Sequence, residues 1–215
     1  MNTFDKTKHE YRINGQPVLS VTQILKEAGL IDSTWFTPEA AERGTFVHTA
    51  CALYDRENLD FERLDERLVP YVSAWTKFRK DSGIVPTIIE TQYFSAKHGF
   101  AGTVDRLWFN GKHIVVGDLK SGALPSWLPI QLGGYSLLTN ALIGMGIELR
   151  DNGKYSVKVV KTQELFKARR LFLEFLAIVK KRRMEHGKED KSFGRRETSR
   201  SSVQRHRDPG QRTRD

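Results

Sequence analysis

Two aspartates and one lysine stand in neighbouring segments that are rich in β-branched and aromatic residues. Asp105 belongs to residues 102–109, and Asp118 precedes Lys120 at the end of the next such segment. Carboxylates suit a hard, oxygen-preferring ion such as Mg²⁺. Such an ion can polarise a phosphate oxygen and lower the pKa of bound water, while a nearby lysine can position that water or neutralise developing charge. These residue types indicate metal-assisted hydrolysis of a phosphate ester.

The turn between the two segments predicts their register. Asn110-Gly111 is the favoured pair for a two-residue hairpin loop, which places Asp105 opposite Val116. Because side chains alternate along a strand, the two aspartates and the lysine then share one face, with the aspartates roughly 7–8 Å apart at the backbone. Such charges are costly to bury, and a bound cation would offset the cost. The alternative is a surface salt bridge between Asp118 and Lys120.

The surroundings of these residues resemble the PD-(D/E)XK nuclease superfamily. Four motifs occur in the superfamily's order: Gly44-Thr45-Phe46-Val47-His48, Gly102-Thr103-Val104-Asp105, Asp118-Leu119-Lys120, and Gln131-Leu132-Gly133-Gly134-Tyr135. They are similar to those of the RecB-type and phage or mitochondrial exonuclease-like members. The resemblance covers roughly residues 11–180. It implies a metal-dependent nuclease.

The resemblance also implies a role for each matching residue. Asp105 and Asp118 would be metal ligands, with a backbone carbonyl near Leu119 completing the shell, and Lys120 would be the catalytic lysine. His48 would be a further metal ligand, whereas a buried core histidine is its alternative reading. The expected cofactor is Mg²⁺ or Mn²⁺.

Three more residues are candidates for the site. Gln131 and Tyr135 lie four apart on a predicted helix and share a face. The resemblance implies that they contact the DNA backbone or brace the active-site lysine, and a plain polar helix face is the alternative. If residues 96–99 form a four-residue hairpin loop, Glu90 faces Asp105 across the strands. Glu90 is then either a third carboxylate ligand or a strand-edge charge.

The elements that position these residues follow from periodicity and turn signals. Helices are expected over residues 20–29, 37–54, 65–81, 126–143 and 162–183, and strands over 84–94, 102–109, 112–119 and 155–160. Two strands are apolar on both faces, which predicts helices on both sides of the sheet. The predicted fold is therefore α/β: a central mixed β-sheet with an antiparallel meander flanked by helices on both faces, a restriction-endonuclease-like core.

Length and charge predict one domain and a tail. The 215 residues suffice for a single nuclease-like domain, expected over residues 1–183. Residues 181–215 hold 12 Lys/Arg against 6 Asp/Glu, which is +6 of the chain's +9. The segment 184–215 is thus predicted to be a basic, disordered tail that favours polyanions.

Composition excludes several other classes. Cys51 is the single cysteine, so an internal disulfide, a Cys-rich zinc site and a cysteine-ligated iron–sulfur cluster are not expected. The chain has no apolar run long enough to span a membrane and no apolar signal core. A cytoplasmic protein of a bacterial or phage-infected host cell is expected.

These observations together predict a Mg²⁺-dependent deoxyribonuclease. The expected mode is an exonuclease on DNA ends or single strands, in phage or bacterial DNA recombination, repair or degradation. One alternative is an endonuclease of the same superfamily, and another is a non-catalytic DNA-binding module that attaches mainly by its basic tail. Trp35 and Trp127 could stack on unpaired bases, with packing as the alternative, and the oligomeric state is left open.

Overall fold

Eight strands and five helices make up the part of the chain that this computed structural model describes, residues 1–32 and 37–203, with side chains described to residue 186. In chain order they are β1 (Asn2–Asp5), β2 (Glu10–Ile13), β3 (Gln16–Ser20), α1 (Val21–Glu27), α2 (Pro38–Asp55), α3 (Val69–Ser82), β4 (Ile88–Ser95), β5 (Phe100–Phe109), β6 (Ile114–Lys120), α4 (Leu128–Thr139), β7 (Ile143–Leu149), β8 (Tyr155–Val160) and α5 (Thr162–Val203). Contacts divide the chain into two units, Met1–Leu176 and Ala177–Asp215. The first unit contains the whole sheet.

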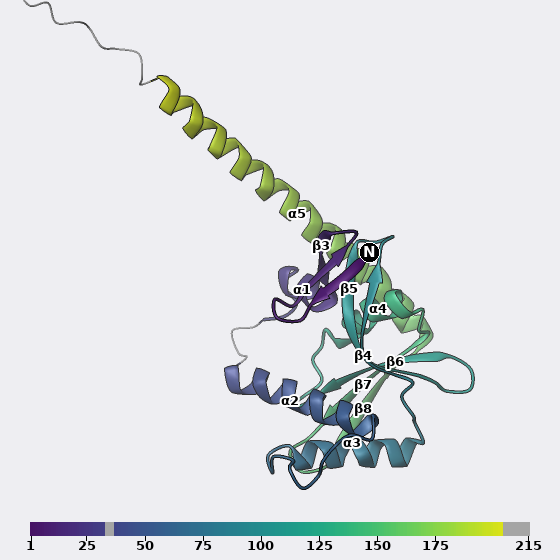
Figure 1. Cartoon of the computed structure of the whole chain (residues 1–215). Coiled ribbons are helices and arrows are strands. Elements are labelled where there is room, and N and C mark those ends of the chain that lie inside the picture. The colour runs from purple at the N-terminus through teal and green to yellow at the C-terminus, as the bar shows by residue number, and fades with distance from the viewer. Residues whose placement is uncertain (33–36, 204–215) are drawn as a thin grey trace, which may run out of the picture. The chain divides into compact units, whose positions relative to one another are not determined.

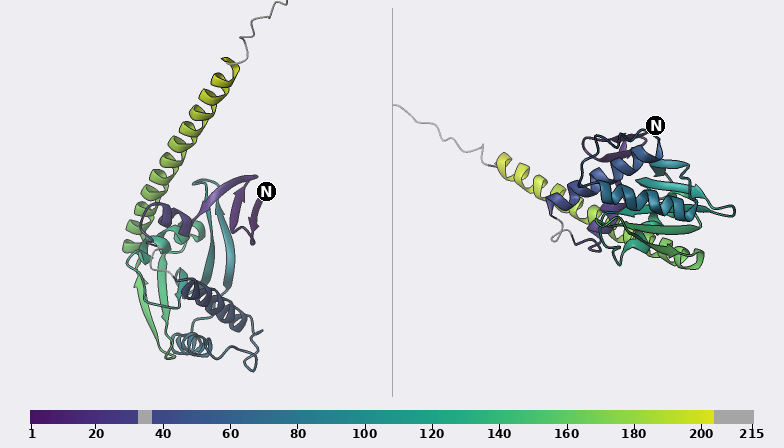
Figure 2. Two further views of the ribbon diagram at one scale, coloured as in Figure 1. Left: turned by 90° about the vertical axis from the view of Figure 1, so that its left-hand side faces the viewer. Right: turned by 90° about the horizontal axis from the view of Figure 1, so that it is seen from below.

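The strands form one mixed sheet in the order β1-β2-β3-β5-β6-β7-β8, and β4 pairs with β5 (Figure 1). The pairs β4–β5, β5–β6 and β7–β8 are antiparallel, whereas β3–β5 and β6–β7 are parallel. The purple strands β1 to β3 extend the sheet beside β5 in Figure 2. The expected mixed sheet with an antiparallel meander is confirmed.

Apolar side chains are buried on both faces of this sheet. On one face, α1, α4 and the first part of α5 contribute residues such as Leu25, Leu132 and Phe172 to a core. On the other face, α2 and α3 lie together (Figure 1) and contribute Cys51 and Trp75 to a second core. Helices on both sides were expected from the strands that are apolar on both faces, and this prediction is confirmed.

The first two helices begin where capping residues predict. The Ser20 side chain accepts from the Gln23 backbone while the Gln23 side chain accepts from the Ser20 backbone, which completes a capping box. Thr37 caps α2, and Pro38 occupies its first position. The third helix begins at Val69, four residues later than predicted.

The β5–β6 hairpin differs from the predicted register by two residues. The loop contains four residues, 110–113, because the Asn110 side chain accepts two backbone N–H groups within it. Val116 therefore lies opposite Leu107 and not opposite Asp105. A shift of one residue would have moved every side chain to the other face, but a shift of two leaves each on its predicted face.

The strand β7 was not predicted from the sequence. The helix expected over 126–143 ends earlier, with Asn140 in the left-handed conformation at φ 58° after α4. Two glycines in β7 face α4, and a Cβ at Gly144 would lie 3.1 Å from the Cβ of Leu132. The second, Gly146, would clash with Leu128 if it carried a side chain. Close packing of α4 thus requires glycine at two positions of β7, and glycine is depleted in strands.

The helix α5 continues to Val203, whereas the sequence predicted its end at residue 183. The backbone at 184–203 is helical, and residues 204–215 of the expected tail lie outside the described part of the chain, as does Trp35. The division into a domain and a basic, disordered tail stays a prediction. Across the described residues, we find no helix with both the length and the apolar character needed to cross a membrane.

Candidate metal centre

The candidate site lies where β5 changes its neighbour. Hydrogen-bonded pairing with β6 runs from Phe109 back to Arg106, while β3 pairs with β5 only at Phe100 and Ala101. The stretch of β5 between these two partners includes Asp105. Beyond this point β6 continues to Lys120 against β7. The backbone groups of β6 that face the gap are therefore available to side chains.

One backbone residue of β6 holds two of the candidate ligands. The Leu119 N–H donates to Asp105 Oδ2 at 2.8 Å, and the Leu119 carbonyl oxygen lies 2.9 Å from His48 Nε2. When the imidazole is neutral, its Nε2–H donates to this carbonyl, which leaves the Nδ1 lone pair directed toward the carboxylates. The carbonyl near Leu119, which the resemblance implied as a metal ligand, contacts His48 in this structure.

The second carboxylate comes from β4. The strands β4 and β5 have the register that a loop of residues 96–99 predicted, so Glu90 lies across from Asp105. His48 Nδ1 is 3.4 Å from Glu90 Oε1 and 3.6 Å from Asp105 Oδ2. Of the two readings left open for Glu90, the structure favours a member of the cluster over a strand-edge charge.

These three side chains fit a divalent cation. One ligand atom each from His48, Glu90 and Asp105 lies within 4.8 Å of the others. The distances of 3.4 Å and 3.6 Å from His48 Nδ1 to the two carboxylates are less than twice an ion–ligand distance of about 2.0–2.2 Å. One imidazole and two carboxylates suit Mg²⁺, Mn²⁺ or a similar ion. A plain core histidine, the alternative reading of His48, would not bring two carboxylates to the same ring nitrogen.

Asp118 and Lys120 form an ion pair beside this group. Lys120 Nζ is 2.6 Å from Asp118 Oδ2, and it lies 5.7 Å from the centre of the Trp127 ring. The Asp118 side chain is 2% exposed, so the pair is not the surface salt bridge of the alternative reading. Asp118 lies outside the group of three ligand atoms, and the ligand role expected for it stays a prediction.

Burial and neighbouring charges shift the pKa values in this site. Burial alone would lower the pKa of His48, but the carboxylates of Asp105 and Glu90 outweigh it and raise this pKa to about 9. Burial raises the pKa of Asp118 to about 6 despite the nearby charge of Lys120. Burial likewise raises the pKa of Asp105. The cluster thus concentrates negative charge that a cation would stabilise.

Gln131 and Tyr135 share a face of α4, but both are buried. Gln131 is 3% exposed and Tyr135 is 6% exposed. Within the described residues, Gln131 Oε1 finds no hydrogen-bond partner. Burial raises the pKa of Tyr135, and the charges of Asp118 and Asp105 raise it further. The DNA contact expected of the two residues would need exposed atoms, so burial favours the alternative of bracing the site.

Sequence reasoning missed two charged residues in this region, Arg106 and Asp55. Arg106 Nη1 donates to Glu90 Oε1 at 2.9 Å, and Arg106 Nε lies 2.6 Å from Asp55 Oδ2. An arginine inside the apolar run of β5 was a usable signal, because arginine is almost never fully buried without a partner. No local pattern marked Asp55, the last residue of α2.

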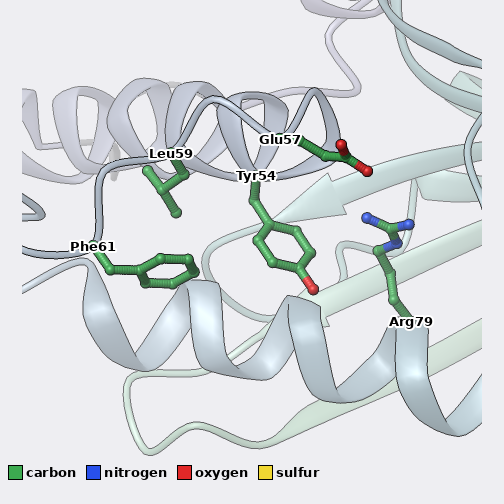
Figure 3. Close-up of a pocket in the computed structure, with 5 residues that line it drawn as sticks. All are labelled: Tyr54, Glu57, Leu59, Phe61 and Arg79. Atoms are coloured by element: carbon green, nitrogen blue, oxygen red, sulfur yellow. The ribbon is translucent and has the colours of Figure 1, made fainter.

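A separate pocket of about 270 Å³ lies at the end of α2 (Figure 3). It is lined by Tyr54, Glu57, Leu59, Phe61 and Arg79. The rings of Tyr54 and Phe61 meet edge to face across it at 6.2 Å. None of the candidate metal ligands lines this pocket.

The chain is similar to known proteins in its fold and not in its sequence. No family model and no curated sequence matches the chain. It is similar to the alkaline exonuclease LHK-Exo from Laribacter hongkongensis, with 11% identity, a TM-score of 0.36 and coverage of 80% of this chain and 94% of that one. The complex of LHK-Exo with dAMP gives 11% identity, a TM-score of 0.41 and coverage of 82% and 94%.

The protein SSO0001 is also similar, with 12% identity, a TM-score of 0.39 and coverage of 76% of this chain and 78% of that one. At TM-scores below 0.5, none of these similarities assigns an activity to this chain. The functional argument therefore rests on the residues of the site.

Proposed function

We propose that this protein is a metal-dependent nuclease that hydrolyses phosphodiester bonds in DNA. The observation that carries the proposal is the convergence of His48, Glu90 and Asp105 within 4.8 Å, next to the buried pair of Asp118 and Lys120. Clustered carboxylates alone would repel a phosphate substrate. A divalent cation would reverse that repulsion and link the cluster to a phosphate.

In this proposal His48, Glu90 and Asp105 hold the cation, Mg²⁺ or Mn²⁺. When bound, the cation would act as a Lewis acid that polarises the phosphate and lowers the pKa of a water molecule. The backbone of Leu119 orients two of the ligands, since its N–H holds Asp105 and its carbonyl holds the His48 ring. This support keeps the ligands in place without side-chain rearrangement.

Lys120 is the proposed catalytic lysine. Its ammonium is held by Asp118 and by the Trp127 ring, and its side chain is 23% exposed. A lysine placed in this way can donate to a phosphate oxygen and stabilise the charge that develops there, or position the attacking water. Asp118 stays in the proposed catalytic set, as the residue that orients Lys120 and as a further candidate ligand.

Two features support DNA as the substrate. The net charge of +9 favours a polyanion, and the resemblance to exonuclease-like members favours DNA ends or single strands. We therefore propose the exonuclease mode, in phage or bacterial DNA recombination, repair or degradation. Gln131 and Tyr135 would brace the site from α4 and not contact the DNA themselves.

The test is cleavage of end-labelled linear DNA, single- and double-stranded, with Mg²⁺, with Mn²⁺ and with EDTA. We expect cation-dependent shortening from the ends and a rate loss of roughly 10²–10⁴-fold for Lys120→Ala and for Asp105→Asn. Lys112→Ala is the matched control, because Lys112 is an exposed lysine in the loop between the same two strands. It should keep the wild-type rate.

The outcomes separate the proposal from its alternatives. Cutting of covalently closed circles would replace the exonuclease mode by an endonuclease mode. DNA binding without cleavage under every cation would refute the nuclease proposal, and the chain would then be a DNA-binding module on this fold. Equal cleavage by wild type and Lys120→Ala would instead refute the catalytic role proposed for Lys120.

A further inference from the structure

A buried ionic network connects α2, α3 and β5. The side chains of Arg106 and Asp55 are both 0% exposed, and Arg106 Nε lies 2.6 Å from Asp55 Oδ2. The other carboxylate oxygen, Asp55 Oδ1, accepts from Arg79 Nη1 at 2.8 Å and from Trp75 Nε1 at 2.9 Å. The Arg106 guanidinium also lies 5.5 Å from the centre of the Trp75 ring.

Such a network is a poor way to stabilise a core. Moving a charged group out of water costs several kcal/mol, and an apolar replacement for a buried ion pair is often as stable as the pair. A methionine in place of Arg106 would fill similar space without that cost. The presence of a fully buried arginine is therefore better explained by the groups that its guanidinium holds.

The guanidinium of Arg106 reaches two of the proposed metal ligands. Arg106 Nη1 donates to Glu90 Oε1 at 2.9 Å and to the backbone carbonyl of Asp105 at 2.6 Å. Glu90 has a φ of 46°, in the left-handed region, which is unfavourable for a residue other than glycine. A residue in this conformation must be held by its contacts, and Arg106 provides one of them.

We propose that Arg106, anchored by Asp55, is a positioning residue that holds Glu90 in the metal centre. This inference rests on the proposed function, and Arg106 itself contacts neither the cation nor the substrate. The oxygen that accepts from Arg106, Glu90 Oε1, is also the one that lies 3.4 Å from His48 Nδ1, and a carboxylate keeps further lone pairs to offer to an ion. The planar fork of arginine can hold Asp55 and Glu90 together, whereas the single ammonium of a lysine cannot replace both bonds.

The test measures Mn²⁺ binding to the full chain by calorimetry, a readout that does not depend on cleavage. Arg106→Lys keeps the charge and should raise the Kd for Mn²⁺ roughly 10–100-fold, as is usual when a residue that supports a metal ligand is changed. Arg79→Lys is the matched control, because Arg79 bonds to the same Asp55 carboxylate but, within the described residues, makes no bond to Glu90. It should leave the Kd near the wild-type value.

A double-mutant cycle then distinguishes positioning from a purely structural role. If Arg106 acts through Glu90, Arg106→Lys should weaken Mn²⁺ binding in the wild type but not in a Glu90→Gln background. A general loss of structure would weaken binding in both backgrounds alike. Circular dichroism in EDTA checks that each variant is folded, and Arg106→Met replaces Arg106→Lys if the lysine variant is not.

Each outcome decides the matter. A folded Arg106→Lys with wild-type Kd, or a penalty that persists with Glu90→Gln, would overturn this inference while leaving the proposed function intact. Failure of both Arg106 variants to fold would assign Arg106 to the fold and overturn it too. Absence of Mn²⁺ binding and of cleavage in the wild type would instead overturn the proposed function, and this inference with it.

Discussion

Gly133 brings α4 against α5 with no room for a side chain. A Cβ at this position would lie 2.6 Å from the carbonyl carbon of Ala168 and 2.8 Å from its oxygen. Ordinary contact begins at 3.4 Å, so Gly133→Ala would force the two helices apart by about 0.8 Å at this point. The obstacle is backbone, and no change of rotamer can relieve it.

The size of the effect follows from two opposing contributions. Overpacking a well-packed core costs about 1–3 kcal/mol, and a clash with backbone belongs at the upper end, about 3 kcal/mol. Replacing glycine by alanine inside a helix stabilises the helix by about 1 kcal/mol, because alanine has the higher helix propensity. We therefore expect Gly133→Ala to lower the free energy of unfolding by about 2 kcal/mol.

Gly44→Ala is the matched control, because Gly44 also lies inside a helix. A Cβ there would meet only Ser121 Oγ within 4 Å, at the ordinary distance of 3.6 Å. Without a clash, only the gain in helix propensity is left, so Gly44→Ala should be more stable than wild type by about 0.5–1 kcal/mol. The two alanine variants should thus shift in opposite directions.

The assay is urea unfolding of the full chain in EDTA, followed by circular dichroism and tryptophan fluorescence. With a urea m-value of about 2 kcal/mol/M, Gly133→Ala should unfold at a urea concentration about 1 M lower than wild type. Unfolding of Gly133→Ala at the wild-type concentration, or equal shifts for Gly133→Ala and Gly44→Ala, would refute the close approach of α4 and α5.

Two further predictions concern single side chains. The pKa of His48 is raised above its ordinary 6.5 to about 9, so its contribution to stability is complete below pH 6.5 and is lost as the pH rises through 9. In EDTA, the stability difference between wild type and His48→Gln should shrink by on the order of 2 kcal/mol from pH 6.5 to 9.5, and a constant difference in thermal melts would contradict this. The Cys51 thiol is 0% exposed and its pKa is raised by burial, so iodoacetamide should modify it at least about 10³-fold more slowly in the native protein than in urea. Rapid native modification, measured by mass spectrometry, would show that α2 does not bury Cys51 against α3 and the sheet.

Local features of the sequence were sufficient for several parts of the fold. The capping residues Ser20 and Thr37 predicted the starts of α1 and α2, because a cap depends on residues three positions away. The loop at residues 96–99 predicted that Glu90 faces Asp105, because loop length determines hairpin register.

Packing between distant segments decided what local patterns could not. The strand β7 was missed because two of its positions must be glycine to leave room for the side chains of α4. The loop between β5 and β6 holds four residues, whereas the pair Asn110-Gly111 predicts two. The longer loop is stabilised by hydrogen bonds from two backbone N–H groups to the Asn110 side chain. The burial of Gln131 and Tyr135 likewise depends on what covers α4, which the helical period does not specify.

The sequence by itself determined which chemical groups are present and which strand faces carry them. It predicted Asp105, Asp118 and Lys120 on one face, and a two-residue error in register leaves the faces of the paired residues 106–109 and 114–117 unchanged because strand side chains repeat every two residues. Only the tertiary structure brought His48 to the carbonyl of Leu119, across 71 positions of the chain. It also left Asp118 outside the group of three ligand atoms and brought Arg106 within hydrogen-bond distance of Glu90. Contacts of this kind depend on how α2 packs against the gap between β5 and β6, and no local spacing encodes that packing.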